Sequence, residues 1–166
     1  MTSTTQFREA TTAEDFIRIA DLADAIWREH YPPIIGKAQV DYMLSRFQTP
    51  KAIADQVAEN MNYFLIQQGE TPVGYLAIQK KGRELFLSKI YLLKSHRGLG
   101  IGKKAMKFIE ERALESGCDR IALRVNKDNQ KSIRAYSKMG FENKGGRIID
   151  IGDGFVMDDF HMVLQL

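Results

Sequence analysis

The chain has 166 residues, enough for one domain, since domains usually run about 100–200 residues. Its composition, 44% apolar and 27% charged, is typical of a soluble globular protein, and no apolar run is long enough to cross a bilayer. Because Cys118 is the one cysteine, an intrachain disulfide and a cysteine metal cluster are excluded. A net charge of +3 does not by itself indicate nucleic acid, and the polar N-terminus lacks a secretory signal, so we expect a single cytoplasmic domain over residues 1–166 with no metal site.

Three helices are predicted in the first third of the chain. Thr11 and Glu14 have the spacing of a capping box, and the apolar residues after them recur at helical intervals. Pro32-Pro33 ends this first helix, and Thr49-Pro50 has the form of an N-cap followed by proline in the first turn. The predicted helices cover residues 13–30, about 40–47 and about 50–60.

The remaining elements predict a mixed α/β order with one strand–loop–helix–strand crossover. The β-rich runs at 63–67, 73–79 and 85–93 are separated by short turns and predict an antiparallel meander. A glycine-rich loop follows. The later elements are a helix at about 101–116 with Gly117 as its C′ stop, a strand at 120–125, a helix at 129–138 and closing strands at 141–151 and 155–164.

The loop at 93–104 is predicted to bind an anion. Glycines at 98, 100 and 102 let backbone N–H groups turn toward a ligand, and the helix that follows adds the positive end of its dipole. Five Lys or Arg residues and no acid lie between positions 94 and 109. A Walker loop and a dinucleotide fingerprint are excluded because position 103 is lysine where each would need glycine. A flexible turn before a solvated basic helix face is the alternative interpretation.

Two further matches make the family resemblance specific. Arg97-Gly98-Leu99-Gly100-Ile101-Gly102 fits the pattern R-x-x-G-x-G/A, and residues 129–141 fit N-x-x-[SA]-x-x-x-Y-x-x-x-G-F. From about residue 62 to the C-terminus, the sequence resembles the GNAT superfamily of N-acetyltransferases, and its closing hairpin is similar to the bacterial polyamine N-acetyltransferase branch. The resemblance implies the GNAT fold, a central, mostly antiparallel twisted sheet with splayed strands 4 and 5 flanked by helices.

The resemblance also implies acetyl-coenzyme A as the cofactor. Its pantetheine arm would lie between the splayed strands as though it were an added strand, paired with the backbone of Ile90 and Leu92. The N–H groups of the glycine loop would cradle the pyrophosphate. The residues assigned to the cofactor are Ile90, Tyr91, Leu92, Arg97, Gly98, Leu99, Gly100, Ile101, Gly102, Lys103, Asn126, Asn129 and Ser132.

Tyr136 is the predicted catalytic residue. Asn129, Ser132, Ile133 and Tyr136 share one helix face, and three of the four are polar, which favours a ligand over a purely structural contact. Taken alone, Tyr136 would more often be a core tyrosine, but its position relative to Met139-Gly140-Phe141 favours the functional interpretation. By resemblance it protonates the coenzyme A thiolate as it leaves.

A general base is not assigned. Strand 84–91 has no carboxylate in its middle, and Glu84 at its start has the character of a solvated turn residue. Two candidates for the base stay open: a water molecule relayed through Ser88, and Glu29 from the first helix. His30 is expected to be structural or exposed.

The acceptor is expected to be a small cationic amine, a polyamine being favoured. Asp150, Asp153, Asp158 and Asp159 lie in the closing hairpin, with no Lys or Arg between positions 148 and 166, and such a hairpin would attract cations unless it is only a solvated turn. The substrate-binding predictions are Glu29, Ser88, Asp158 and Asp159.

Three alternatives stay open. The chain could be a protein N-terminal or lysine acetyltransferase, or a non-catalytic module that senses acyl-coenzyme A. A nucleic-acid binder is disfavoured because the basic loop lacks interleaved aromatic residues and any known binding motif. The oligomeric state, a homodimer included, is left open.

Overall fold

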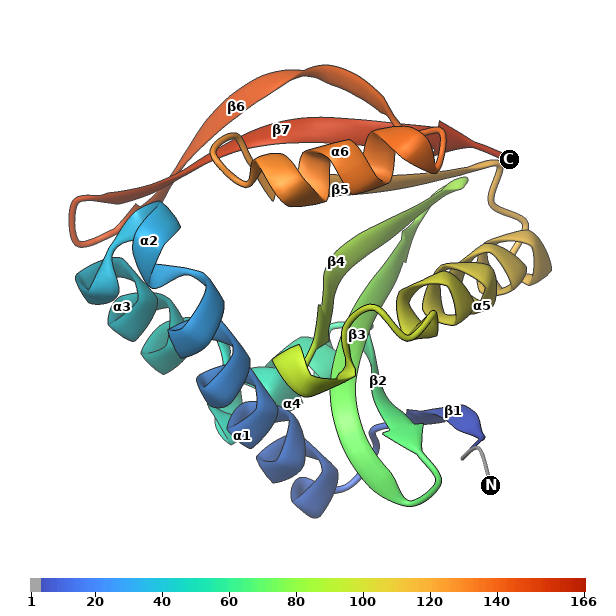
Figure 1. The fold of residues 1–166 in the computed structure, drawn as a ribbon, viewed down its shortest axis with the longest axis horizontal. Coiled ribbons are helices and arrows are strands. Elements are labelled where there is room, and N and C mark those ends of the chain that lie inside the picture. Colours follow the sequence, from blue (N-terminus) through green and yellow to red (C-terminus); the bar gives the residue numbers. More distant parts are fainter. Residues whose placement is uncertain (1–3) are drawn as a thin grey trace.

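A seven-stranded sheet forms the centre of the computed structural model, which describes residues 4–166 (Figure 1). The strands are β1 Thr5–Glu9, β2 Asn62–Gln68, β3 Thr71–Lys81, β4 Glu84–Leu92, β5 Arg120–Asn126, β6 Glu142–Gly152 and β7 Phe155–Gln165. They lie in the order β1-β2-β3-β4-β5-β7-β6, and every neighbouring pair is antiparallel except β4 and β5. The predicted meander and the mostly antiparallel sheet are confirmed.

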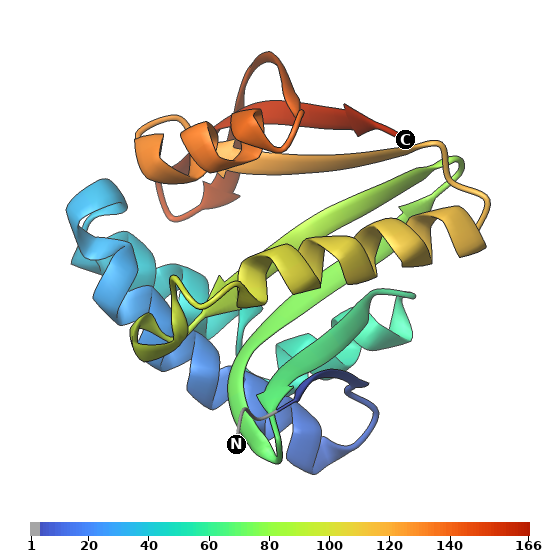
Figure 2. The same ribbon diagram turned by 45° about the vertical axis from the view of Figure 1, so that its right-hand side comes forward.

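Helices cover both faces of the sheet and create two hydrophobic cores. The helices are α1 Ala13–His30, α2 Pro32–Ile35, α3 Lys37–Phe47, α4 Pro50–Ala58, α5 Ile101–Glu115 and α6 Gln130–Lys138, with a short 3-10 turn at Lys94–His96. Ile26 and Trp27 of α1 pack with Tyr75 on one face, whereas Ile109 of α5 packs with Leu76 on the other. Figure 2 shows α5, in yellow, on the near side of the green strands. Because side chains alternate along β3, the neighbours Tyr75 and Leu76 join different cores.

The predicted splay of the fourth and fifth strands is confirmed. β4 pairs with β5 only where Glu84–Leu87 lies beside Arg120–Leu123. Beyond this point β4 continues through residues 88–92 without a β5 partner, while β5 stays paired with β7 up to Asn126, opposite Asp159 (Figure 1). One edge of the second half of β4 is therefore free to pair with another extended group.

The N-terminal part of the chain differs from the prediction in several details. The short helix α2 was not predicted, since Pro32-Pro33 ends α1 and also starts a new turn, and α3 begins at Lys37 rather than near residue 40. Strand β1 was not predicted, because its five residues show no apolar alternation, and it forms a half-exposed edge strand paired with β2. The capping box lies one residue later than predicted, at Thr12 and Asp15 rather than at Thr11 and Glu14. The Asp15 carboxylate also accepts a hydrogen bond from Arg8 at 2.8 Å, and this tertiary contact selects it over Glu14.

Candidate active site

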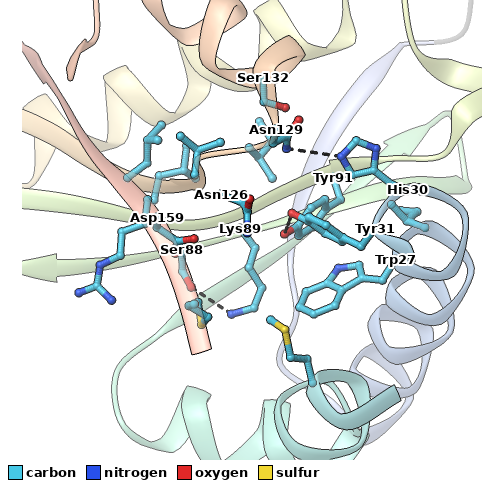
Figure 3. Close-up of a pocket in the computed structure, with 18 of the residues that line it drawn as sticks. Trp27, His30, Tyr31, Ser88, Lys89, Tyr91, Asn126, Asn129, Ser132 and Asp159 are labelled. Carbon is cyan, nitrogen blue, oxygen red and sulfur yellow. Dashed lines mark hydrogen bonds between the residues drawn. The ribbon is translucent and has the colours of Figure 1, made fainter. Parts of the chain in front are cut away.

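A cavity of about 560 Å³ lies between the free half of β4 and the elements that face it. Its walls come from α1, from α3 and α4, from residues 86–92 of β4, from the end of β5, from α6 and from β7. Figure 3 shows polar side chains from α1, β4, β5, α6 and β7 pointing into one space. The splay of the sheet therefore brings together residues that lie up to 133 positions apart in the sequence, from Ile26 to Asp159.

The glycine loop follows directly from β4 and leads into α5. Gly98 and Gly100 have φ angles of +77° and +81°, in the left-handed region that favours glycine. No atom lies within 4 Å of the position that a Cβ would take at either residue, so the loop is open to a ligand. Gly100 is the N-cap of α5 and offers no side-chain cap, which leaves the first N–H groups of the helix without a side-chain acceptor.

Arg97 is the loop residue that lines the cavity, together with Leu92 at the end of β4. Its Nε donates to the Leu92 carbonyl at 3.1 Å, and its guanidinium donates to Glu29 at 3.2 Å. Glu29, predicted to bind the acceptor, is not among the residues that line the cavity and lies beside Arg97 and Lys94 instead. The glycines and Lys103 lie outside the cavity wall, where an extended ligand leaving the cavity along β4 would meet them.

The polar face of α6 turns into the cavity as its spacing predicted. Asn129, Ser132 and Tyr136 line it, whereas Ile133 packs against the core on the α5 side. Asn129 is only 7% exposed, and its amide nitrogen lies 3.5 Å from Nε2 of His30. His30 was expected to be structural or exposed, yet it is half-buried and lines the same cavity.

Tyrosines form a connected group inside the cavity. The hydroxyls of Tyr31 and Tyr91 lie 2.8 Å apart, and the ring of Tyr136 packs edge-on against Phe141. Burial raises the pKa of Tyr136 well above its ordinary value, and the hydroxyl of Tyr31 raises it further. Tyr136 is therefore neutral at physiological pH, with its hydroxyl available as a hydrogen-bond donor in the cavity.

A β-bulge at Ser88 changes which residues of β4 face the cavity. Ala77 pairs with Lys89 and Ile78 pairs with Leu87, so Ser88 is the extra residue. As a result the adjacent side chains of Ser88 and Lys89 point the same way, and the Lys89 amine donates to the Ser88 hydroxyl at 3.0 Å (Figure 3). Sequence reasoning proposed Ser88 but missed Lys89. The sequence pattern that could have indicated Lys89 is a charged residue within the mostly apolar run 85–93.

Asp159 supplies the only carboxylate among the described residues that line the cavity. It is 6% exposed, and no described residue donates a hydrogen bond to its side chain. Burial raises the pKa of Asp159 to about 6. The positive charge of Arg124 lowers this pKa, but its effect is smaller than that of burial. Burial raises the pKa of Tyr31, and the charge of Asp159 raises it further.

The other three hairpin aspartates do not line the cavity. Asp158 pairs with Lys127 on the outside of β7, Asp150 accepts a hydrogen bond from the backbone of Gly152 at 2.8 Å, and Asp153 is exposed in the turn. Neighbouring residues of a strand point to opposite faces, which separates Asp158 from Asp159. The predicted acidic hairpin thus contributes one side chain to the cavity rather than a combined field.

Glu84, at the start of β4, lies outside the cavity wall. It is near Arg120, with 3.4 Å between the carboxylate and the guanidinium Nε. Within residues 4–166, no group of three or more His, Cys, Asp or Glu side chains is placed to hold a metal ion. No helix of this part of the chain is long and apolar enough to span a bilayer.

The splayed sheet, the glycine loop and the polar helix face together define the GNAT class of fold. Residues 19–141 match the model of the acetyltransferase (GNAT) family, and the chain belongs to this family. A PaiA N-acetyltransferase from Thermoplasma acidophilum, solved in complex with coenzyme A, has the same fold with a TM-score of 0.82, 17% identity and coverage of 98% of this chain and 99% of that one.

Two curated relatives are similar over part of the chain. An uncharacterized N-acetyltransferase of Mycobacterium tuberculosis is 36% identical over 95 residues, which are 57% of this chain and 60% of the relative. Thialysine N-epsilon-acetyltransferase of Mus musculus is 35% identical over 81 residues, 46% of this chain and 48% of the relative. The matches thus extend over about half to three-fifths of the length of these relatives.

Proposed function

We propose that this protein transfers the acetyl group of acetyl-coenzyme A to a primary amine of a small molecule. The observation that carries the proposal is the cavity between the splayed strands, where the free edge of β4, Tyr136 and the unpartnered carboxylate of Asp159 meet. A strand edge suits an extended amide-bearing arm, and the two side chains suit proton transfer at its end.

Coenzyme A fits the glycine loop and the free edge of β4. The loop offers open backbone at Gly98 and Gly100, the uncapped N-terminus of α5 and a basic flank, which together suit a pyrophosphate. The neighbour from Thermoplasma acidophilum was solved with coenzyme A, which supports the same cofactor here. We assign the backbone of Ile90 and Leu92 to the pantetheine amides, with Asn129 beside the arm.

The reaction is a direct attack of the amine on the thioester. The amine nitrogen forms a bond to the carbonyl carbon, the carbon–sulfur bond breaks, and the sulfur leaves as a thiolate. We assign to Tyr136 the donation of a proton to this thiolate, because its hydroxyl is protonated at neutral pH and it lines the cavity at the end of the proposed pantetheine site. Asp159 takes the proton that the amine must lose, since its pKa of about 6 leaves it ionised at neutral pH.

The acceptor is proposed to be a small amine rather than a polyamine. Thialysine N-epsilon-acetyltransferase, by its name, acetylates an amine of a small molecule, and this supports an amine acceptor. A polyamine would place several positive charges in a cavity that has one carboxylate, Asp159, and the cation Lys89. The free, buried Cys118 suits the reducing cytoplasm, where we propose that the protein acts.

The proposal is tested in two steps with the full chain. Titration calorimetry should show that acetyl-coenzyme A binds, and release of free coenzyme A should then be measured with a panel of small amines, amino acids and N-terminal peptides. A small amine acetylated in preference to peptides is the expected result. Absence of acetyl-coenzyme A binding would remove the proposal, whereas binding without turnover on any acceptor would favour a sensing module.

A further inference from the structure

We propose that the acceptor carries a carboxylate as well as its amine, and that Lys89 binds this carboxylate. The inference rests on the proposed function and assigns a substrate class to the same cavity. It starts from the side-chain amine of Lys89, which lies inside the cavity on the face of the sheet that α1, α3 and α4 cover.

The position of Lys89 is fixed by the bulge in β4. The register shift at Ser88 puts Lys89 on the face of Tyr91 and Leu93, both packed against the core of α1. Its amine donates to the Ser88 hydroxyl at 3.0 Å and lies 5.7 Å from the centre of the Tyr63 ring. Within residues 4–166, no carboxylate lies within 4.0 Å of this amine.

An ammonium group without a counter-ion is costly in such surroundings. Burial lowers the pKa of Lys89 to about 8, so most molecules still carry the charge at pH 7. Within residues 4–166 the contacts of the Lys89 amine are the Ser88 hydroxyl and the Tyr63 ring, and neither is an anion that would neutralise the charge. A carboxylate of the substrate would supply the missing partner in a charge-assisted hydrogen bond.

The remaining charges of the cavity agree with a substrate of this class. Lys89, Arg97, Arg124 and Lys131 line it as cations, against the single carboxylate of Asp159. Arg97 is bonded to Glu29, and Arg124 lies over the ring of Phe86, 5.4 Å from its centre. Lys89, Ser88 and Asp159 all line this cavity (Figure 3). An amino acid can satisfy both groups, with its amine at Asp159 and its carboxylate at Lys89, whereas a diamine satisfies only Asp159.

The test compares each amino acid with its own amide, which keeps the amine and removes the negative charge. The pairs are glycine, β-alanine, γ-aminobutyrate and L-lysine with the corresponding amides, so that the spacing of the two groups varies. For the acceptor that fits best, we expect kcat/KM of the acid to exceed that of the amide by about 10- to 100-fold, the usual strength of a hydrogen bond between charged groups.

Variants of Lys89 assign the preference to this residue. Lys89→Met should bring acid and amide to equal kcat/KM with unchanged binding of acetyl-coenzyme A, while Lys89→Arg should keep a preference for the acid. Lys51→Met is the matched control, because it removes one positive charge from an exposed pair with Asp55 and should leave the preference intact. If a variant fails to fold, the comparison of acids with amides in the wild-type protein still tests whether the acceptor carries a carboxylate.

Several results would overturn the assignment. Equal use of acids and amides by the wild type, retention of the preference in Lys89→Met, better use of peptide amides than of free amino acids, or acetylation of Lys89 itself in the intact mass spectrum would each do so. A protein that acetylates amines without a preference for acids overturns only the role of Lys89. A protein that acetylates no amine overturns the proposed function as well.

Discussion

The candidate active site has two halves, the cavity itself and the glycine loop outside its wall, and they are built in different ways. The cofactor half consists mainly of backbone: a free strand edge, two glycines with positive φ and the uncapped start of α5. The acceptor half consists of side chains from distant parts of the chain, among them Tyr31, Lys89, Tyr136 and Asp159. We therefore expect the backbone conformation at the glycines to determine cofactor binding. In the acceptor half, we expect the burial and charge of the side chains to determine which amine binds.

This difference predicts how each half responds to mutation. Side-chain changes in the cofactor half should matter less than changes that add bulk or charge at the glycines. In the acceptor half, single side chains should matter through their protonation state, because burial has shifted the pKa of Tyr136, Asp159 and Lys89. The predictions below test this contrast, starting with the largest effect.

Gly100→Asp should abolish binding of acetyl-coenzyme A, with the dissociation constant raised at least about 10³-fold. The variant places a side chain at a φ of +81° and a negative charge where the phosphates are expected. Titration calorimetry measures the effect. Gly82→Asp is the matched control, because Gly82 also has a positive φ, of +63°, in open space but lies in the turn between β3 and β4. Equal loss in both variants would point to general strain instead of phosphate binding.

Tyr136→Phe should lower kcat by about 10²–10⁴-fold, the range for loss of a general acid. The ring packing against Phe141 is kept, so the affinity for acetyl-coenzyme A should not change. Steady-state kinetics and calorimetry together measure the two effects. An unchanged kcat would make Tyr136 a packing residue and would revive the sensing module.

Asp159→Asn should lower kcat/KM by about 10²-fold at pH 8 and remove the acidic limb of its pH profile. In the wild type the raised pKa of Asp159 means that kcat/KM falls as the pH drops below about 6. The same shift has a cost: because the folded pKa lies above the ordinary value of 3.8, ionisation of Asp159 destabilises the fold, an effect that grows from about pH 4 and is complete above about pH 6. The variant should therefore gain about 3 kcal/mol of unfolding free energy at pH 7.

Asp158→Asn provides the comparison for this experiment. Asp158 is the next residue in the chain, but it pairs with Lys127 outside the cavity. Its replacement should leave the acidic limb in place and change kcat/KM by less than about fivefold, as expected for an exposed pair. If Asp158→Asn lowered kcat/KM more than Asp159→Asn, the acceptor would bind on the outer surface of the hairpin and not in the cavity.

The contrast between the two halves also explains what the sequence could predict. Helix and strand periods, the glycine loop and the α6 face are local patterns that the sequence shows directly, whereas the splay of β4 and β5 and the place of the pantetheine arm were implied by the resemblance to the GNAT superfamily. The bulge at Ser88 depends on pairing with β3, and the burial of Asp159 depends on how β5, β7 and α1 meet. No local pattern distinguishes Asp159 from Asp158, because the face of the strand that turns inward is set by the assembled sheet.

Glu29→Gln should have the smallest effect. This variant tests whether Glu29 belongs to the cofactor half or to the acceptor half of the site. The sequence suggested the acceptor side, but the carboxylate contacts Arg97 at 3.2 Å and is partly exposed. Exposed pairs contribute about 0–1 kcal/mol, so release of Arg97 toward the cofactor phosphates should tighten acetyl-coenzyme A binding by no more than about fivefold. The kcat/KM for the amine, measured at saturating acetyl-coenzyme A, should stay the same. Glu14→Gln, which breaks an exposed pair with Arg18 on the same helix, should change neither quantity. A tenfold or greater loss for the amine with unchanged cofactor binding would show that Glu29 contacts the acceptor, and that the acceptor half extends beyond the cavity wall along α1.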